Sequence, residues 1–393
     1  MERISRPQSG YFDTNSCDIE EFRALIARHL DPDQVPRAAE VVRNIPIYDM
    51  AALLPSLRDP SHRRALLSEW AFVFGQSSGV LVLRGAYAET EAVDAATRIY
   101  EEIIADERAA GSGQDHFAAA GANDRVWNSL HKLCERDPAT FAAYFGNIVI
   151  AAVSEAWLGP NYQVTAQVNQ VRPGGAAQQA HRDYHLGFMT ADQAAAFPSH
   201  VHELSAALTL QGAIAHTDMP VESGPTKLLP FSQLYRPGYL AAQLEPFRDA
   251  FEEHHVQLPL AKGDALFFNP ALFHAAGANT SADIRRMANL LQVSSALGLP
   301  LENIDRVAMC KRLYAALHEG VPGLSAEQID AAISACADGY SFSTNLDRDP
   351  PEGGLAPQTQ AALMRQALKE GWGPEKFGAA LDKQTERRSA SLL

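Results

Sequence analysis

A histidine and a carboxylate two residues apart, His181 and Asp183, constrain this chain more than any other feature. They lie in the segment 167–188, whose neighbouring residues favour an extended backbone. On an extended backbone, residues i and i+2 point to the same side, so these side chains can occupy adjacent positions on one metal ion. A site of this kind needs a third ligand, which the rest of the chain is expected to supply together with scaffold and lid.

His274 is the expected third ligand. It follows the run 262–273, in which a Gly-Asp turn leads into an apolar strand. Arg285 comes eleven residues later, at the start of another expected strand, and two adjacent antiparallel strands would place His274 and Arg285 in one cavity. Arg286 is the alternative, because neighbouring residues of a strand face opposite sides. The eleven-residue spacing favours Arg285.

Two histidines and one carboxylate on one face of a metal leave three coordination positions open, which is typical of non-haem Fe(II) oxygenases. Two open positions suit a bidentate 2-oxo acid, and the third suits O₂. An arginine deeper in the barrel can grip the far carboxylate of such a co-substrate through a two-pronged ion pair. The four residues together therefore predict an iron centre that uses a 2-oxo acid.

In this order and spacing, His181-x-Asp183, His274 and Arg285 resemble the phytanoyl-CoA dioxygenase family of Fe(II)/2-oxoglutarate oxygenases. Three further segments are similar to the family pattern: the glycine-bounded strand 79–84, the Gly-Pro segment 218–232 and the Gly-Asp turn 262–264. The order and spacing of these pieces together are specific. Two departures are Phe231-Ser232-Gln233 in place of the usual Gly-Ser-His, and Ala275-Ala276 in place of Gly-Ser.

The resemblance implies a mainly β core, a double-stranded β-helix (cupin-like jelly roll), with helical N-terminal and C-terminal elaborations. It implies Fe(II) bound by His181, Asp183 and His274, 2-oxoglutarate bound through its distal carboxylate by Arg285, and O₂ as the oxidant. No catalytic residue is expected beyond the metal ligands.

Polar residues on the strand before His-x-Asp often contact the co-substrate in this family. Gln167 and Asn169 share a face by the period of two, so both are expected to help bind 2-oxoglutarate. His185 is a candidate substrate contact, while Tyr184 and Phe188 are expected to be core or pocket walls.

The hydrophobic pattern predicts three parts: a helical N-terminal arm and support over residues 1–74, the β-helix core over 75–298 and a helical extension over 299–393. Strands are expected at 79–85, 162–171, 204–214, 226–229, 256–260, 265–268 and 287–297. The Gly/Ala-rich stretch 111–125 is expected to be a loop near the active site. This layout suits one β domain wrapped by helices.

Composition excludes several classes of partner. The net charge of -14, from 33 Lys and Arg against 47 Asp and Glu, repels phosphate backbones and anionic membrane surfaces, so no nucleic acid or membrane partner is expected. The four cysteines include no CxxC, which favours buried thiols in a reducing cytosol. With no apolar leader and no membrane-spanning run, a cytoplasmic location is expected. The pattern does not indicate an oligomeric state.

The expected reaction is hydroxylation of a C–H bond of a small organic metabolite, with release of succinate and CO₂. A carboxylate at Asp183 argues against the halogenating variant, in which a small residue leaves room for chloride. Desaturation, cyclisation and epimerisation remain alternatives, as does a non-catalytic or differently metallated cupin-like binding protein. A CoA thioester would call for a basic surface, which the net charge does not indicate.

Overall fold

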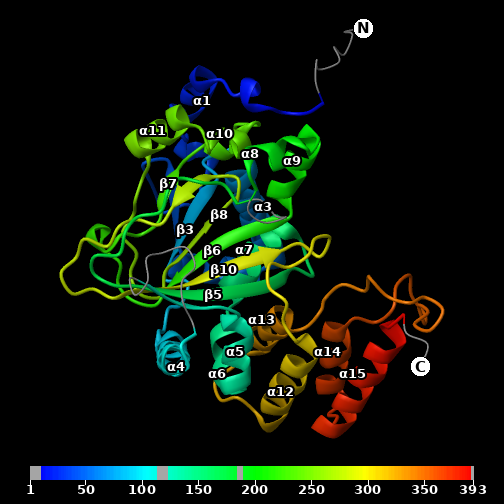
Figure 1. Ribbon diagram of the computed structural model, residues 1–393. Coiled ribbons are helices and arrows are strands. Elements are labelled where there is room, and N and C mark those ends of the chain that lie inside the picture. The colour runs from blue at the N-terminus through cyan, green and yellow to red at the C-terminus, as the bar shows by residue number, and fades with distance from the viewer. Residues whose placement is uncertain (1–9, 113–122, 184–188, 391–393) are drawn as a thin grey trace.

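The computed structural model describes residues 10–112, 123–183 and 189–390 of the 393-residue chain. Its strands are β1 (Glu40–Val42), β2 (Ile45–Asp49), β3 (Val80–Arg84), β4 (Asn123–Val126), β5 (Gln163–Val171), β6 (Thr209–Ala215), β7 (Lys227–Leu229), β8 (Ala265–Phe268), β9 (Phe273–Ala275) and β10 (Arg286–Ser294). In these described residues, an eight-stranded sheet has the order β1-β2-β3-β8-β6-β10-β5-β4, and β7 pairs with β9 in a second sheet (Figure 1).

The large sheet has two chemically different faces because its strands alternate. In the antiparallel pair β6–β10, Gln211 lies opposite Gln292 and Ala213 opposite Leu290, and these side chains face the interior between the two sheets. Residues of the other parity, such as Leu210 and Val293, are fully buried in the core that the sheet shares with its helices. One face of the sheet therefore packs against the helices, while the opposite face is available for a binding site.

The helices of the described chain are α1 (Ile19–Ile26), α2 (Met50–Arg58), α3 (Pro60–Gln76), α4 (Glu91–Ala109), α5 (Ser129–Arg136), α6 (Pro138–Phe145), α7 (Ile148–Leu158), α8 (Ala191–Ala195), α9 (Ser199–Ala207), α10 (Gly238–Ala241), α11 (Glu245–His254), α12 (Arg306–Glu319), α13 (Ala326–Cys336), α14 (Gln360–Lys369) and α15 (Pro374–Arg388). Their starts follow the sequence signals. Asp18 caps α1 by accepting from the backbone N–H groups of Glu20 and Glu21, and Asp59 caps α3 ahead of Pro60.

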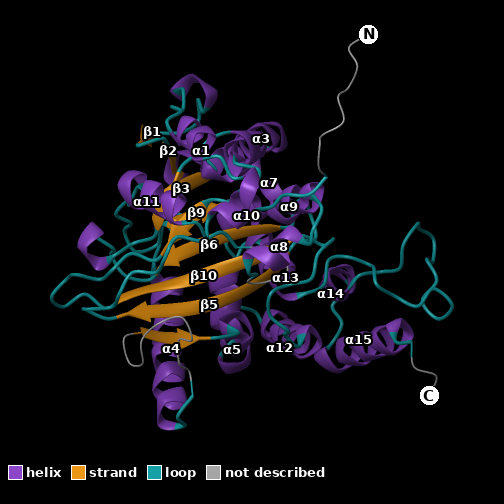
Figure 2. Cartoon of the chain, turned by 45° about the horizontal axis from the view of Figure 1, so that its top comes forward, coloured by secondary structure: helices purple, strands orange, loops and turns teal. Residues whose placement is uncertain are grey.

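The helices form layers on both sides of the two sheets (Figures 1 and 2). Helices α3, α5, α7 and α13 contact the outer face of the large sheet, and the C-terminal helices join this layer through α12 and α13. On the far side, α1 and α11 cover the small sheet through the aromatic cluster of Phe22, Phe247, Phe251 and Phe273. The result is the expected jelly-roll core with helical elaborations, and that prediction of fold class is confirmed.

Three local predictions were wrong. Residues 204–207 belong to α9, so β6 begins only at Thr209. The segment 256–260 forms isolated bridges at Val256 and Leu260 rather than a strand. Conversely, the end of the expected loop 111–125 contains β4, which pairs with β5 at the sheet edge. In the last case pairing with β5 decided the structure, because short segments have weak local preferences.

Two strands of the N-terminal 74 residues, β1 and β2, extend the large sheet beyond β3. The division into three parts at residues 75 and 299 stays a prediction. Among the described residues, no single helix combines the length and apolarity needed to cross a bilayer, although the bent pair α6 and α7 meets that criterion when taken together.

Candidate metal centre

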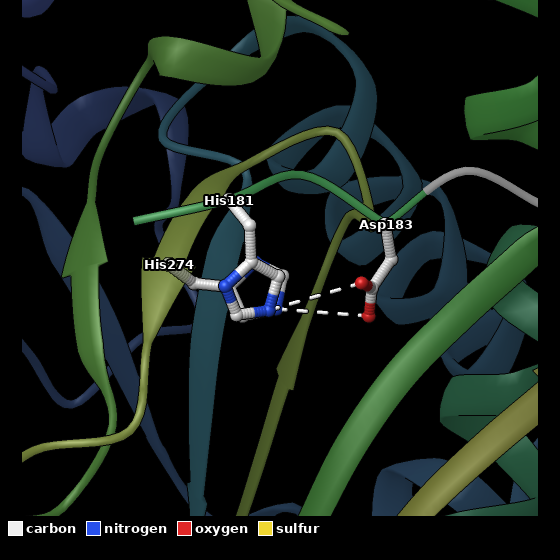
Figure 3. A group of neighbouring side chains, drawn as sticks. All are labelled: His181, Asp183 and His274. Atoms are coloured by element: carbon white, nitrogen blue, oxygen red, sulfur yellow. Dashed lines mark ion pairs between the residues drawn. The ribbon is translucent and has the colours of Figure 1, made fainter. Parts of the chain in front are cut away.

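The structure brings together the three side chains expected to bind a metal. His181 and His274 form an antiparallel bridge in which each backbone N–H donates to the other carbonyl, at 3.0 and 3.1 Å. The backbone N–H of Asp183 donates to Pro270 O at 3.1 Å, which fixes the next turn of chain beside the bridge. One donor atom from each side chain lies within 4.8 Å of the others (Figure 3).

Both imidazoles present the same nitrogen to the centre. The Nδ1 of His181 is 2.9 Å from Gln179 O, and the Nδ1 of His274 is 2.8 Å from Leu272 O. Since a carbonyl only accepts, each Nδ1 carries the proton and each Nε2 keeps a free lone pair. Each Nε2 lies 3.8 Å from an oxygen of Asp183. Burial lowers the pKa of His274, and the neighbouring His181 lowers it further, which favours the neutral form that binds metals.

The carboxylate of Asp183 is held from one side. Its Oδ2 accepts a hydrogen bond from Nε2 of Gln211 on β6. Its Oδ1 is buried and accepts no hydrogen bond from any described residue. A buried carboxylate oxygen without a donor is costly unless a cation satisfies it. The chemistry of the donor set, two neutral nitrogens and one anionic oxygen, fits a divalent transition metal.

Arg182, the residue between the two ligands, points away from the centre into the protein. Its guanidinium donates to Ser232 O and lies over the rings of Tyr239 and Phe273, at 5.3 and 5.2 Å from their centroids. A Cβ at Gly238 would lie 2.0 Å from its Cζ, so a larger residue there would displace the guanidinium. These contacts fix the backbone that carries His181 and Asp183.

The centre opens onto a cavity of about 740 Å³ between the two sheets. Arg286 lines it from the start of β10, with 7% of the residue exposed. Its Nη1 has no hydrogen-bond partner in the described chain, and burial lowers the pKa of the guanidinium to about 10, which still leaves it charged near neutral pH. A buried cation aimed into a cavity is a strong site for an anionic ligand.

Arg285 does not line this cavity, and the prediction that it faces the centre was wrong. Its side chain is exposed, whereas that of Arg286 is buried. Strand β10 begins at Arg286, and the residues of even number on β10 line the cavity, including Ala288, Leu290 and Gln292. The number of residues between His274 and the strand that follows the loop does not determine which residues of that strand face the cavity.

Gln167 and Asn169 both line the cavity from β5, as their shared parity predicts. The Oε1 of Gln167 accepts from Arg125 at 2.9 Å, and its amide also hydrogen-bonds Glu302. Asn169 differs, because its buried Oδ1 has no partner among the described residues. Of the two amides, Asn169 is the one with an acceptor left for a bound molecule.

Two charged residues in the cavity wall were missed by sequence reasoning. Arg125 lies on β4 and stacks on Trp127, with its Cζ 5.1 Å from the ring centroid. Glu302 follows β10, and its carboxylate accepts from the backbone N–H groups of Asn128 and Ala166. Burial raises the pKa of Glu302. Neither position carries a local motif: the pairing of β4 with β5 places Arg125 at the cavity, and the two backbone hydrogen bonds place Glu302 there.

The other motif segments support the site. Asp264 of the Gly-Asp turn accepts from Gly85 N at 2.7 Å and Ala261 N at 2.9 Å, which ties β8 to the end of β3. Gly224, at a φ of 76°, contacts the 277–278 backbone so closely that a Cβ would lie 2.3 Å from Ala278 O. Phe231 occupies the position of the family glycine with a φ of 68°. Tyr184, His185 and Phe188 lie outside the described residues.

A jelly roll with two histidines and a carboxylate around one point of its cavity defines the class of non-haem iron oxygenases. The model of the family "Phytanoyl-CoA dioxygenase (PhyH)" matches residues 75–287, more than half of the chain, and the chain belongs to this family. It is therefore a 2-oxoglutarate-dependent dioxygenase that uses Fe(II), 2-oxoglutarate and O₂.

The chain is similar to two curated dioxygenases and to one solved structure. The chain is 24% identical over 216 residues to "Dioxygenase trt7" of Aspergillus terreus, covering 54% of this chain and 68% of that protein. It is 28% identical over 139 residues to "Dioxygenase andF" of Emericella variicolor, covering 34% and 43%. It is also similar to the epimerase SnoN, solved with Fe3+, alpha ketoglutarate and nogalamycin RO, at 21% identity and a TM-score of 0.44, covering 60% of this chain and 86% of SnoN.

Proposed function

We propose that His181, Asp183 and His274 bind Fe(II), that Arg286 binds the distal carboxylate of 2-oxoglutarate, and that the enzyme hydroxylates a C–H bond of a small organic metabolite with release of succinate and CO₂. The observation that carries the proposal is the His/Asp/His cluster opening onto a cavity that also contains a buried arginine without a carboxylate partner among the described residues.

The three ligands fit the iron role in charge and in orientation. Each Nε2 is free because its ring is held through Nδ1, and the Oδ1 of Asp183 has no other donor in the described chain. When bound there, the iron supplies the oxidation, which 2-oxoglutarate and O₂ drive. The chain's own contribution is to hold three ligands on one side, so that the remaining positions stay open toward the cavity.

Arg286 suits the distal carboxylate because its charge is buried and unneutralised. A guanidinium offers two parallel N–H donors, which match the two oxygens of a carboxylate. Asn169 lies on the neighbouring strand β5, directly opposite Ala288 of β10. Ala288 is two residues from Arg286 on the same strand. We propose that the Asn169 amide, turned so that Nδ2 faces the cavity, donates to the same co-substrate, because a carboxylate only accepts. Gln167 then acts through Arg125 and Glu302 as part of the wall rather than as a direct ligand of 2-oxoglutarate.

The substrate is proposed to be a neutral or weakly polar organic molecule. A cavity of about 740 Å³ lies within the range of sites for drug-sized ligands, and 2-oxoglutarate needs only part of it. The part of its wall that β6 and β8 supply is uncharged, with Thr209, Gln211 and Ala213 from β6 and Phe268 from β8. The charged groups Arg125 and Glu302 stand on the β4–β5 side, where Leu301 adds an apolar surface.

The same iron chemistry also supports desaturation, cyclisation or epimerisation, and the identity of the product distinguishes these outcomes from hydroxylation. A non-catalytic binding protein is the alternative of a different class. It predicts a chain that binds a small molecule and releases no succinate.

The test is succinate release from 2-oxoglutarate by the purified chain with Fe(II) and ascorbate, repeated over a metabolite panel. We expect wild type to release succinate slowly without a substrate and faster when a substrate is present. The His181→Ala variant should release none under either condition. The product formed from the stimulating compound is then identified by mass spectrometry, where a gain of one oxygen marks hydroxylation. Equal release by wild type and the His181→Ala variant would reject the proposed iron site.

A further inference from the structure

Gln211 makes the direct contact between the wall of the cavity and the proposed iron ligand Asp183. It lies on β6 with 4% of the residue exposed, and its side chain lines the cavity. Its Nε2 donates to Oδ2 of Asp183. Because an ionised carboxylate cannot donate, this contact fixes the orientation of the amide, and Oε1 must point elsewhere. In the described chain Oε1 has no hydrogen-bond partner.

We infer that Gln211 is a positioning residue of the metal centre, which keeps Asp183 as a one-oxygen ligand. This inference rests on the proposed iron site. With Oδ2 occupied by the amide N–H, Oδ1 is the oxygen left to face the metal. A carboxylate without this restraint is able to rotate about its Cβ–Cγ bond and to bind through both oxygens. That would occupy a position that the co-substrate needs.

The geometry makes this role specific to Gln211. Strand β6 presents it from the rigid centre of the sheet, hydrogen-bonded on one side to β10 and on the other to β8. Asp183 itself comes from a loop, where one backbone hydrogen bond, to Pro270 O, fixes it. Outer contacts that orient a metal ligand typically change metal affinity by about 10- to 100-fold when removed. An effect of that size is expected here.

Gln292 is a matched control provided by the chain. It is the same residue type, lies directly opposite Gln211 on β10 and lines the same cavity. No hydrogen bond to Asp183 is recorded for it among the described residues. Methionine has nearly the length and volume of glutamine and no N–H donor. Gln211→Met and Gln292→Met therefore differ mainly in whether the bond to Asp183 is lost.

In the experiment, Co(II) is titrated into the metal-free full chain. Calorimetry measures the affinity, and the visible d–d spectrum of the bound Co(II) reports its coordination number. We expect Gln211→Met to weaken Co(II) binding by about 10- to 100-fold and to change the band intensity. Gln292→Met should bind within about twofold of wild type with the same spectrum. Gln211→Asn keeps an amide in the wall but shortens it by one methylene, so it should behave as Gln211→Met does. It also serves as the second variant if the methionine variant does not fold.

The outcomes separate this inference from the proposed function. If His181→Ala binds Co(II) as tightly as wild type, the metal site itself is wrong. If His181→Ala loses Co(II) but Gln211→Met and Gln211→Asn keep wild-type affinity and spectrum, the site stands and Gln211 does not position Asp183. Equal losses in Gln211→Met and Gln292→Met would mean a general effect on the cavity wall, which also overturns the inference.

Discussion

Replacing Arg286 by methionine should abolish useful binding of 2-oxoglutarate, while the same change at Arg285 should leave it intact. The two arginines are neighbours in sequence with opposite surroundings: Arg286 is 7% exposed in the cavity wall, and Arg285 faces solvent. The pair therefore allows the same chemical change to be compared at a buried position and at its exposed neighbour, at the start of β10.

The magnitude follows from the burial of Arg286. Two unit charges about 4 Å apart interact by about 4 kcal/mol at an effective dielectric constant of about 20, and removing one partner of a desolvated pair costs about 2–5 kcal/mol. Four kcal/mol corresponds to an affinity loss of roughly a thousandfold. At Arg285 the effect should stay within about 0.5 kcal/mol, or under about threefold. Folding stability should not fall in Arg286→Met, because the change removes an unneutralised buried charge.

The assay is an anaerobic titration of 2-oxoglutarate into the Fe(II)-loaded protein, followed by the charge-transfer absorption of the chelate and checked by calorimetry. Each variant is first tested for Fe(II) or Co(II) binding, so that a loss of metal is not read as a loss of co-substrate. The reasoning is refuted if Arg285→Met loses affinity and Arg286→Met keeps it. Loss in both variants would also refute it, since the exposed side chain would then contribute as much as the buried one.

Three further outcomes are expected. Burial lowers the pKa of His216 to about 3 from 6.5, so the unfolded chain binds more protons between these values and stability falls as pH drops. From pH 6.5 to 4.5 this lowers the free energy of unfolding by about 2.3 kcal/mol, which urea titrations of wild type should show in excess over His216→Gln. Gly238→Ala should push Arg182 out of its place, cost about 1–3 kcal/mol and weaken Co(II) binding, whereas Gly10→Ala, with nothing within 4 Å of its Cβ, should do neither. Co(II) at about 100 times its Kd should raise the free energy of unfolding by about 2.7 kcal/mol, a gain that a chelator removes and His274→Ala never shows.

The cluster of His181, Asp183 and His274 was predictable because its signals are chemical and local. A His-x-Asp pair and a histidine after a Gly-Asp turn describe a metal site through the residue types themselves, and the family pattern placed them in one jelly roll. The helix starts at Asp18 and Asp59 were predictable for the same reason, because an N-cap depends only on the residue type at the start of the helix and on the adjacent backbone.

The orientation of Arg286 was also encoded in the sequence, although in a different signal. Met287, Leu291 and Val293 share the parity that faces the helical core, which assigns Arg286 to the opposite face. The segment between His274 and Arg285 includes a loop, and the length of a loop does not determine which face of the next strand a given residue occupies. The alternation within the strand was therefore the better guide than the count of residues.

The sequence by itself predicted the residue types of the proposed iron and co-substrate ligands: two imidazoles, one carboxylate and a guanidinium, in the order of a known oxygenase family. Tertiary structure alone decided that Gln211 hydrogen-bonds Asp183 and that Glu302, from beyond β10, completes the cavity wall. The physical reason is the separation along the chain between the residues that interact. Ligand identity and helix caps depend on neighbours within a few residues, whereas contacts across β6, β10 and β5 depend on strand pairing between segments far apart in the chain.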